Sequence, residues 1–188
     1  SYSDSYNGTG VKGWIVKGNN DHEIFIPKGG WKYDGKEKYV GESAFYWSSE
    51  LDNLSKPLGG QFFPNYIGIG SYERAIRMLI RPVYDDAIVH VDPGVPETGE
   101  AGKGVDLGLS VKWADRNIGS TVSSDYGKYF AWGETVSKQN YSVSTYSLLD
   151  TLKSDGTYSK KFLGYDISGS DYDAAHVLWS GTWRMPTQ

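Results

Sequence analysis

The sequence predicts a strand-rich fold with little helix, on the strength of three observations. Glycine contributes 24 of the 188 residues and aromatic side chains 15%, a composition that favours short strands and tight turns over helical bundles. Short apolar stretches recur between clusters of turn-forming residues. One segment, 168–181, has the end signals of a helix. With 38% hydrophobic residues, the chain is long enough to bury a core of its own.

The first part of the chain is predicted to form a series of short strands separated by glycine-rich loops. The predicted strands are 11–17, 23–27 and 43–49, and the predicted loops are 27–41 and 50–60. Residues 61–70 and 74–83 are predicted to pair as a hairpin, because Ile76, Met78 and Ile80 recur with a two-residue period in the second stretch.

The second part begins with a linker and ends with the helix. Residues 84–104 start as a strand that ends at His90 or Val91 and continue with two prolines and four glycines, which is linker composition. A hairpin over 105–119, a strand over 126–134 and a polar stretch over 135–169 follow. In the helix, Ser170 is predicted to cap, Asp171 and Asp173 to lie in the first turn, and Gly181 to follow the last turn.

Composition and charge exclude several classes of function. The formal net charge is −4 and no basic patch is present, which argues against binding to nucleic acid. The chain has no cysteine, so disulfides, thiolate catalysis and cysteine-ligated zinc are excluded. No uninterrupted apolar run approaches ~18 residues, so no membrane-spanning segment is predicted.

No pattern of reactive residues predicts an enzyme. The histidines His22, His90 and His176 show no i, i+4 pair and no adjacent nucleophile motif. Glu134 lies among apolar neighbours and is interpreted as a structural carboxylate that holds a loop, with a general base as the alternative. The acidic pairs Asp85–Asp86 and Asp171–Asp173 supply too few oxygens for calcium, so neither a metal nor a cofactor is predicted.

Most tryptophans are predicted to lie in the core, because they occur within apolar phrases; these are Trp14, Trp47, Trp113, Trp132, Trp179 and Trp183. Trp31 differs, since it lies in a glycine-rich stretch beside Lys32 and Tyr33. Arg81 and Arg184 also have apolar neighbours, and we expect each guanidinium to have a hydrogen-bonded partner.

Several phrases resemble a known family. "VDLGLSVKWADRNIG", "DYGKYFAWGET", "SDYDAAHVLW" and "GTWRMPT" resemble the first half of the Fibrobacter succinogenes major paralogous domain, a secreted or surface module of Bacteroidetes and Fibrobacteres. "NGTGVKGWIVKGNNDHEIFIPKGG", "AFYWSSE" and "RMLIRPV" resemble its second half. The resemblance covers about four-fifths of the chain. It implies an α+β, C-type lectin-like fold.

The two halves occur in the reverse of the family's order. The resemblance therefore predicts a C-terminal half over 1–84, a strand and linker over 85–104, and an N-terminal half over 105–188, without the helix expected between the halves. Either the halves pair as a circular permutant or the chain joins two tandem repeats. Pairing within the chain, or with a separate piece that supplies the missing helix, is favoured, because the linker is long enough and the effective concentration within one chain is high. The final "WRMPTQ" is expected to stop inside a domain.

By resemblance, the chain is a non-enzymatic binding module at the outer-membrane surface of a Gram-negative bacterium or outside the cell. Its partner is expected to be a glycan or a protein. The alternative is an assembly role, in which incomplete halves self-associate between repeats or subunits. The ligand-facing surface is expected over residues 50–74, supplemented by Trp31; its members are Trp31, Asp52, Asn53, Gln61, Asn65, Tyr66, Tyr72 and Arg74. The "EPN", "QPD" and "WND" phrases of sugar-binding relatives are missing, which argues against calcium-mediated sugar binding.

Overall fold

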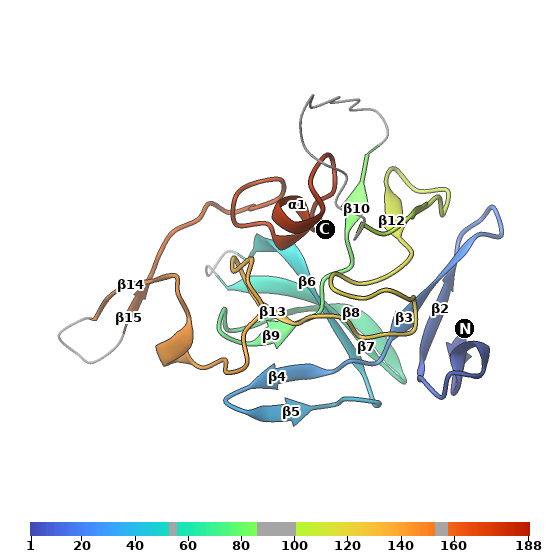
Figure 1. Cartoon of the computed structure of the whole chain (residues 1–188), viewed down its shortest axis with the longest axis horizontal. Helices are drawn as coiled ribbons and strands as arrows, with labels where there is room; N and C mark the ends of the chain where they lie inside the picture. Colours follow the sequence, from blue (N-terminus) through green and yellow to red (C-terminus); the bar gives the residue numbers. More distant parts are fainter. Residues whose placement is uncertain (53–55, 86–100, 153–157) are drawn as a thin grey trace.

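Short antiparallel strands make up most of the regular structure. The computed structural model of the chain describes residues 1–52, 56–85, 101–152 and 158–188. Within these ranges the strands form several small sheets, and the α-helical content is the single helix α1 (Ala174–Trp179) (Figure 1). The predicted strand-rich fold with little helix is confirmed. No helix within the described ranges is long and apolar enough to cross a membrane.

The chain begins with a three-stranded antiparallel sheet. Its strands are β1 (Tyr2–Ser3), β2 (Gly13–Lys17) and β3 (Glu23–Pro27), with the 3₁₀ turn η1 (Tyr6–Gly8) between the first two. The predicted strands at 11–17 and 23–27 are confirmed, and the turn between them places Asp21 at φ +66°. Trp14 on β2 and Ile26 on β3 lie opposite each other and are buried.

The hairpin of β4 (Trp31–Tyr33) and β5 (Lys36–Lys38) corrects the predicted loop at 27–41. Asp34 and Gly35 connect the strands with φ of +49° and +69°. Two consecutive positive φ values are typical of the two-residue hairpin turn for which Asp-Gly is a strong signal. The Asp34–Gly35 pair in the sequence therefore indicated this hairpin. Strand β4 also pairs with β9 (Arg77–Met78), which in turn pairs with β13 (Phe130–Ala131).

The central sheet consists of β6 (Ala44–Leu51), β7 (Pro57–Phe63) and β8 (Tyr66–Ser71). The predicted strand at 43–49 is confirmed. The predicted loop at 50–60 is wrong at both ends, and the predicted hairpin between 61–70 and 74–83 is wrong. The hairpin instead lies within 57–71, because Pro64 and Asn65 form a two-residue turn in what was interpreted as one strand.

A third small sheet joins residues on either side of 86–100. Strands β10 (Val83–Tyr84) and β11 (Gly104–Val105) both pair with β12 (Lys112–Ala114). The hairpin predicted over 105–119 is confirmed by the β11–β12 pairing. The strand predicted to end at His90 or Val91 is described only as far as β10, and the remainder of that prediction lies outside the described residues.

The polar stretch 135–169 contains the 3₁₀ turn η2 (Val143–Thr145) and a hairpin of β14 (Leu149–Leu152) and β15 (Tyr158–Lys160). This hairpin extends away from the other sheets at one side of the molecule (Figure 1). Within the predicted strand at 126–134, Phe130 and Ala131 form strand β13.

Helix α1 begins later than the sequence suggested. Asp173 is its N-cap, and its Oδ1 accepts hydrogen bonds from the backbone N–H groups of Ala175 (2.8 Å) and His176 (3.2 Å). The predicted cap, Ser170, instead donates its hydroxyl to the Ile167 carbonyl at 2.7 Å. The prediction was wrong because both residues are good capping types, and local pattern alone does not choose between them.

Residues before and after the segment 86–100 pack together in one hydrophobic core. Phe45, Trp47, Met78 and Ile80 pack there with residues from 105–188; these are Ala114, Ile118, Phe130, Trp132, Ile167, Ala174, Ala175, Trp179 and Met185. Of the tryptophans predicted to be core, four are buried (Trp14, Trp47, Trp132 and Trp179), and Trp113 and Trp183 are half-buried. The segments before and after 86–100 therefore pack together within one chain.

Candidate functional site

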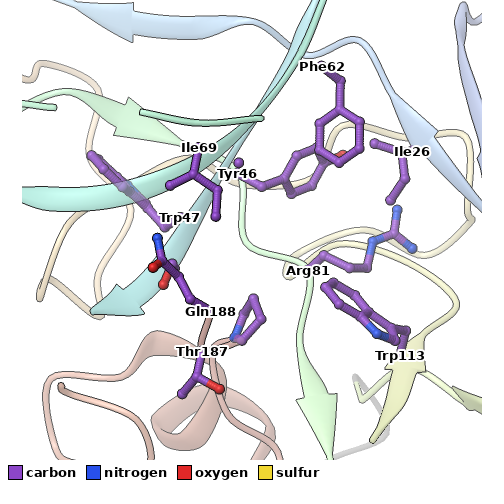
Figure 2. A pocket seen from close by; sticks show the side chains of 12 residues that line it. Ile26, Tyr46, Trp47, Phe62, Ile69, Arg81, Trp113, Thr187 and Gln188 are labelled. Atoms are coloured by element: carbon purple, nitrogen blue, oxygen red, sulfur yellow. The ribbon is translucent and has the colours of Figure 1, made fainter. Parts of the chain in front are cut away.

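A pocket of about 170 Å³ lies on one face of the central sheet (Figure 2). Its lining comes from the sheet, from β3, from β12 and from the last residues of the chain. The lining residues are Ile26, Tyr46, Trp47, Ser48, Gly60, Phe62, Ile69, Arg81, Trp113, Pro186, Thr187 and Gln188. Most of these side chains are apolar or aromatic, as is usual for ligand pockets.

Side chains on one face of the central sheet form the first wall of the pocket. Tyr46 on β6, Gly60 on β7 and Ile69 on β8 are cross-strand neighbours, so their side chains point to the same face of the sheet. Gly60 leaves space at the centre of this row, and Phe62 lies beside it with a ring carbon 3.5 Å from where a Cβ at Gly60 would be. The missing side chain at Gly60 therefore helps to create the hollow.

Arg81 borders the pocket between Ile26 and Trp113 (Figure 2). Its guanidinium is 1% exposed and donates to the carbonyls of Ala114 (3.0 Å) and Phe25 (2.7 Å), which meets the expectation of a hydrogen-bonded partner. Burial lowers the pKa of Arg81, and the nearby Tyr46 opposes this shift. These two carbonyl contacts tie β3 to the strand that ends at Ala114.

The Tyr46 hydroxyl is fixed at the same side of the pocket. It donates to the Pro27 carbonyl at 3.3 Å and accepts from Asn117 Nδ2 at 3.1 Å. Burial raises the pKa of Tyr46, so the phenol stays neutral well above neutral pH. A neutral, hydrogen-bonded hydroxyl orients a ring without adding charge to the pocket.

The last residues of the chain form the second wall. The Ser49 N–H donates to the Pro186 carbonyl at 2.9 Å, and the Gln188 N–H donates to Glu50 Oε2 at 2.7 Å. One step earlier, the Met185 N–H donates to the buried Asp173 carboxylate at 2.8 Å. Thr187 and Gln188 supply polar groups to the rim of the pocket (Figure 2).

The acidic and histidine side chains of the described residues are dispersed, and Glu134 has a structural role. No three histidine or acidic side chains gather among these described residues as a metal site would require. Glu134 Oε1 accepts from the Ser147 N–H (2.6 Å) and from Lys138 Nζ (2.5 Å), so it holds the 134–147 loop as predicted. Asp86 and His90 lie outside the described residues.

The predicted ligand surface falls mainly on the opposite face of the β7–β8 hairpin. Gln61 accepts a hydrogen bond from the Tyr72 hydroxyl at 2.6 Å, and the exposed Tyr66 lies on the same face. Asn65 is exposed in the turn of the hairpin. None of these residues lines the pocket.

The remaining predicted site residues are separate from this group. Arg74 is 2% exposed, donates to the Lys161 carbonyl at 2.7 Å and lies over the Trp132 ring, so it is a core residue and no part of an exposed surface. Trp31 is half-buried on β4. Asp52 Oδ1 accepts a hydrogen bond from the Lys56 N–H at 2.8 Å. Asn53 lies outside the described residues.

The predicted ligand surface includes the β7–β8 hairpin but lacks the face of this hairpin that lines the pocket. The alternation in "GQFFPNYIGIG" places Phe62 and Ile69 on one face and Gln61 and Tyr66 on the other, which was available as a signal. The contributions of Trp113 and Gln188 come from distant segments and had no local signal. Comparison of the chain with models of protein families, with curated proteins and with solved structures finds no match.

Proposed function

We propose that this chain is a non-enzymatic binding module that recognises its ligand through the pocket on the central sheet. The observation that carries the proposal is the pocket itself: about 170 Å³, lined by the rings of Tyr46, Phe62 and Trp113. Concave sites with aromatic linings and a few polar groups at the rim are the usual form of small ligand sites.

The lining favours a protein or peptide ligand over a glycan. A sugar displays hydroxyls on every side, and each one that is buried without a partner costs free energy. The polar groups at the rim come mainly from Ser48, Thr187 and Gln188, while the walls are apolar. An aliphatic or aromatic side chain of a protein ligand matches such a pocket better, and large apolar anchors commonly dominate protein interfaces.

The wider assignment rests on the resemblance described above. We propose a C-type lectin-like domain of the Fibrobacter succinogenes major paralogous type, with its halves in permuted order, at the cell surface or secreted. The core shared by residues before and after 86–100 favours pairing of the halves within one chain. This shared core does not favour an assembly role in which halves are exchanged between subunits.

A pocket-filling variant tests the proposal. The nearest atom to a Cβ at Gly60 is 3.5 Å away, so the Cβ is accommodated, and the two γ carbons of Gly60→Val are expected to extend into the hollow. Purified protein would be applied to a glycan array and to a phage-displayed peptide library, with calcium and with a chelator. Ligands that the wild-type chain selects should bind Gly60→Val at least tenfold more weakly and should bind equally with the chelator.

The opposite face supplies the matched control. Tyr66→Ala alters the exposed surface that faces away from the pocket and should leave affinity unchanged. Loss of binding in Tyr66→Ala with retention in Gly60→Val would move the site to the other face of the hairpin. Binding that needs calcium would contradict the metal-free site, and selection of neither glycans nor peptides would count against a binding module.

A further inference from the structure

Strand β8 is a long, uncharged sheet edge. It is the outermost strand of the central sheet, and no charged residue occurs from 57 to 72. Its side chains reach solvent: Tyr66 is 53% exposed, Ile67 63% and Ile69 51%. The β7–β8 register runs without a bulge from Leu58 to Ser71. Natural proteins usually protect such edges with lysines, prolines, bulges or short strands.

Several other sheet edges in the described structure are protected. Strand β5 is composed of Lys36, Glu37 and Lys38, all exposed. Strand β3 is buried over most of its length, and its Phe25 carbonyl accepts from Arg81. Several edges are only two residues long; these are β1, β10, β11 and β13. Among the described residues, the edge of β8 has none of these forms of protection, which makes it a candidate for pairing with a partner strand.

The hydrogen-bond phase of β8 fixes which backbone groups face outward. The Tyr72 N–H donates to the Pro57 carbonyl at 2.9 Å, so Tyr72 points toward β7. Backbone groups of successive residues in a strand point to opposite sides, which directs Gly70 and Gly68 toward β7 as well. The N–H and C=O groups of Ile67, Ile69 and Ser71 consequently point away from the sheet.

We propose that two copies of this chain associate by antiparallel pairing of their β8 strands about a twofold axis at Gly68. In this register Ile67 of one copy lies opposite Ile69 of the other, and the two residues exchange backbone hydrogen bonds. On the opposite face, Tyr66 lies opposite Gly70 of the second copy, where the missing side chain leaves room for the ring. Gly68 lies opposite itself.

Self-complementarity is the reason for choosing a second copy as the partner. The alternation Ile-Gly-Ile-Gly after Tyr66 places two isoleucines on one face and two glycines on the other, so an antiparallel copy matches every position. Apolar cross-strand pairs contribute to sheet stability, and like charges directly opposite each other destabilise it. The chain has a net charge of −4, but its uncharged β8 edge lets two copies meet without like charges in register.

Single cysteines test the register directly, because the chain has no cysteine of its own. Gly68 would form a non-hydrogen-bonded pair with itself, with Cα atoms about 4.5 Å apart. That separation lies within the range that a disulfide can bridge. Gly68→Cys should therefore form a covalent dimer under mild oxidation. The added Cβ meets the end of the exposed Tyr66 ring, which can swing aside.

Ser71→Cys is the matched control. It lies on the same exposed edge, but in this register Ser71 faces Asn65 of the other copy and is remote from its own equivalent. It should remain monomeric by non-reducing electrophoresis. Equal cross-linking of Gly68→Cys and Ser71→Cys, or none in either, would overturn the proposed pairing. Circular dichroism of both variants shows whether each is folded.

Solution mass gives a second test that needs no cysteine. Sedimentation equilibrium of the wild-type chain should show a mass that rises from monomer to dimer with concentration. The double variant Ile67→Lys/Ile69→Lys places on β8 the kind of charge that β5 carries, and should weaken the dimer at least tenfold at unchanged melting temperature. A wild-type chain that stays monomeric at every accessible concentration would sink the proposal.

Discussion

The two walls of the pocket are held by different kinds of contact. The sheet wall rests on packed aromatic rings behind it: the half-buried Tyr72 packs edge-on against the buried Trp47 with centroids 6.0 Å apart, and the half-buried Phe63 against the buried Phe45 at 5.5 Å. The wall formed by 186–188 is held by backbone hydrogen bonds instead. Ser49 and Glu50 of β6 bind it, and Asp173 binds the residue before it.

The difference shows how rigidity is distributed around the site. Hydrogen bonds are directional, so a few of them hold a short segment in one position. Apolar packing is not directional, and on the sheet wall it decreases outward, from the fully buried Trp47 on β6 to the exposed Ile69 on β8. The pocket therefore has one wall fixed by its hydrogen bonds and one whose outer strand remains available for pairing.

The largest effect is expected behind the sheet wall. Trp47 is 0% exposed, and its Nε1 donates to the Phe130 carbonyl at 2.8 Å. Trp47→Ala should lower the free energy of unfolding by about 3–5 kcal/mol, since large aromatic truncations in cores cost that much. Urea denaturation measures this. Ile67→Ala, on the exposed edge of the same sheet, should change the free energy of unfolding by no more than about 0.5 kcal/mol. Equal costs for the two variants would contradict the contrast between inner and outer strands.

Asp173→Ala should destabilise the hydrogen-bonded wall. Its carboxylate accepts from four backbone N–H groups, those of Gly169, Ala175, His176 and Met185. Losing the helix cap costs about 1 kcal/mol, and leaving the Met185 N–H unpaired in the interior adds about 1–3 kcal/mol. The exposed neighbour Asp171→Ala is the control for loss of charge alone. A cost for Asp173→Ala as small as the control's would show that these bonds do not fix the segment.

Tyr72 provides a pH-dependent test of the sheet wall. Burial raises the pKa of Tyr72 to about 12, from an ordinary value of 10.0. The unfolded chain then loses this proton at lower pH than the folded chain does. Stability from Tyr72 is therefore fully present below pH 10 and is lost as pH rises through about 12.

Tyr72→Phe should cost about 1 kcal/mol at neutral pH, because it removes the hydrogen bond to Gln61. It should also reduce the fall in stability between pH 10 and 12, seen in urea titrations across that range. Burial likewise raises the pKa values of Tyr129 and Tyr146, so part of the fall will persist. If the pH dependence of stability is unchanged in Tyr72→Phe, folding does not shift the pKa of Tyr72.

The smallest effect is expected at the outer end of the hydrogen-bonded wall. Glu50→Gln replaces the carboxylate that accepts from the Gln188 N–H, at an exposed contact. We expect a cost of about 0.5 kcal/mol or less, as for most surface substitutions. Thermal unfolding of Glu50→Gln beside the wild-type chain measures it. A cost approaching that of Asp173→Ala would mean that the final residue is held as firmly as Met185.

Much of the local structure followed from residue patterns. Apolar stretches bounded by turn clusters located β2, β3, β6 and the β11–β12 hairpin, and the helix was placed within a few residues. The errors arose where turn chemistry was overlooked: Asp34–Gly35 and Pro64–Asn65 each connect a hairpin inside a segment interpreted as a loop or a single strand. Both pairs form two-residue turns, the commonest connection in β-hairpins.

The candidate site was less accessible to sequence reasoning. Residue type suggested Gln61 and Tyr66 as ligand contacts, and it could not show that Arg74 would be buried against Trp132. A guanidinium in an apolar phrase can point inward or outward, and only the packing around it decides. The same limit applies to Trp113, which contributes to the pocket from a strand distant in sequence.

What the sequence by itself determined was the class of structure: many short strands, one helix, an aromatic core, and an uncharged stretch from 57 to 72. These follow from propensity, periodicity and composition, which act over a few neighbouring residues. Only the tertiary structure decided that Gly60, Trp113 and Gln188 enclose one hollow and that β8 is an outer strand of its sheet. Such features depend on which distant segments meet, and that is set by the packing of the whole core.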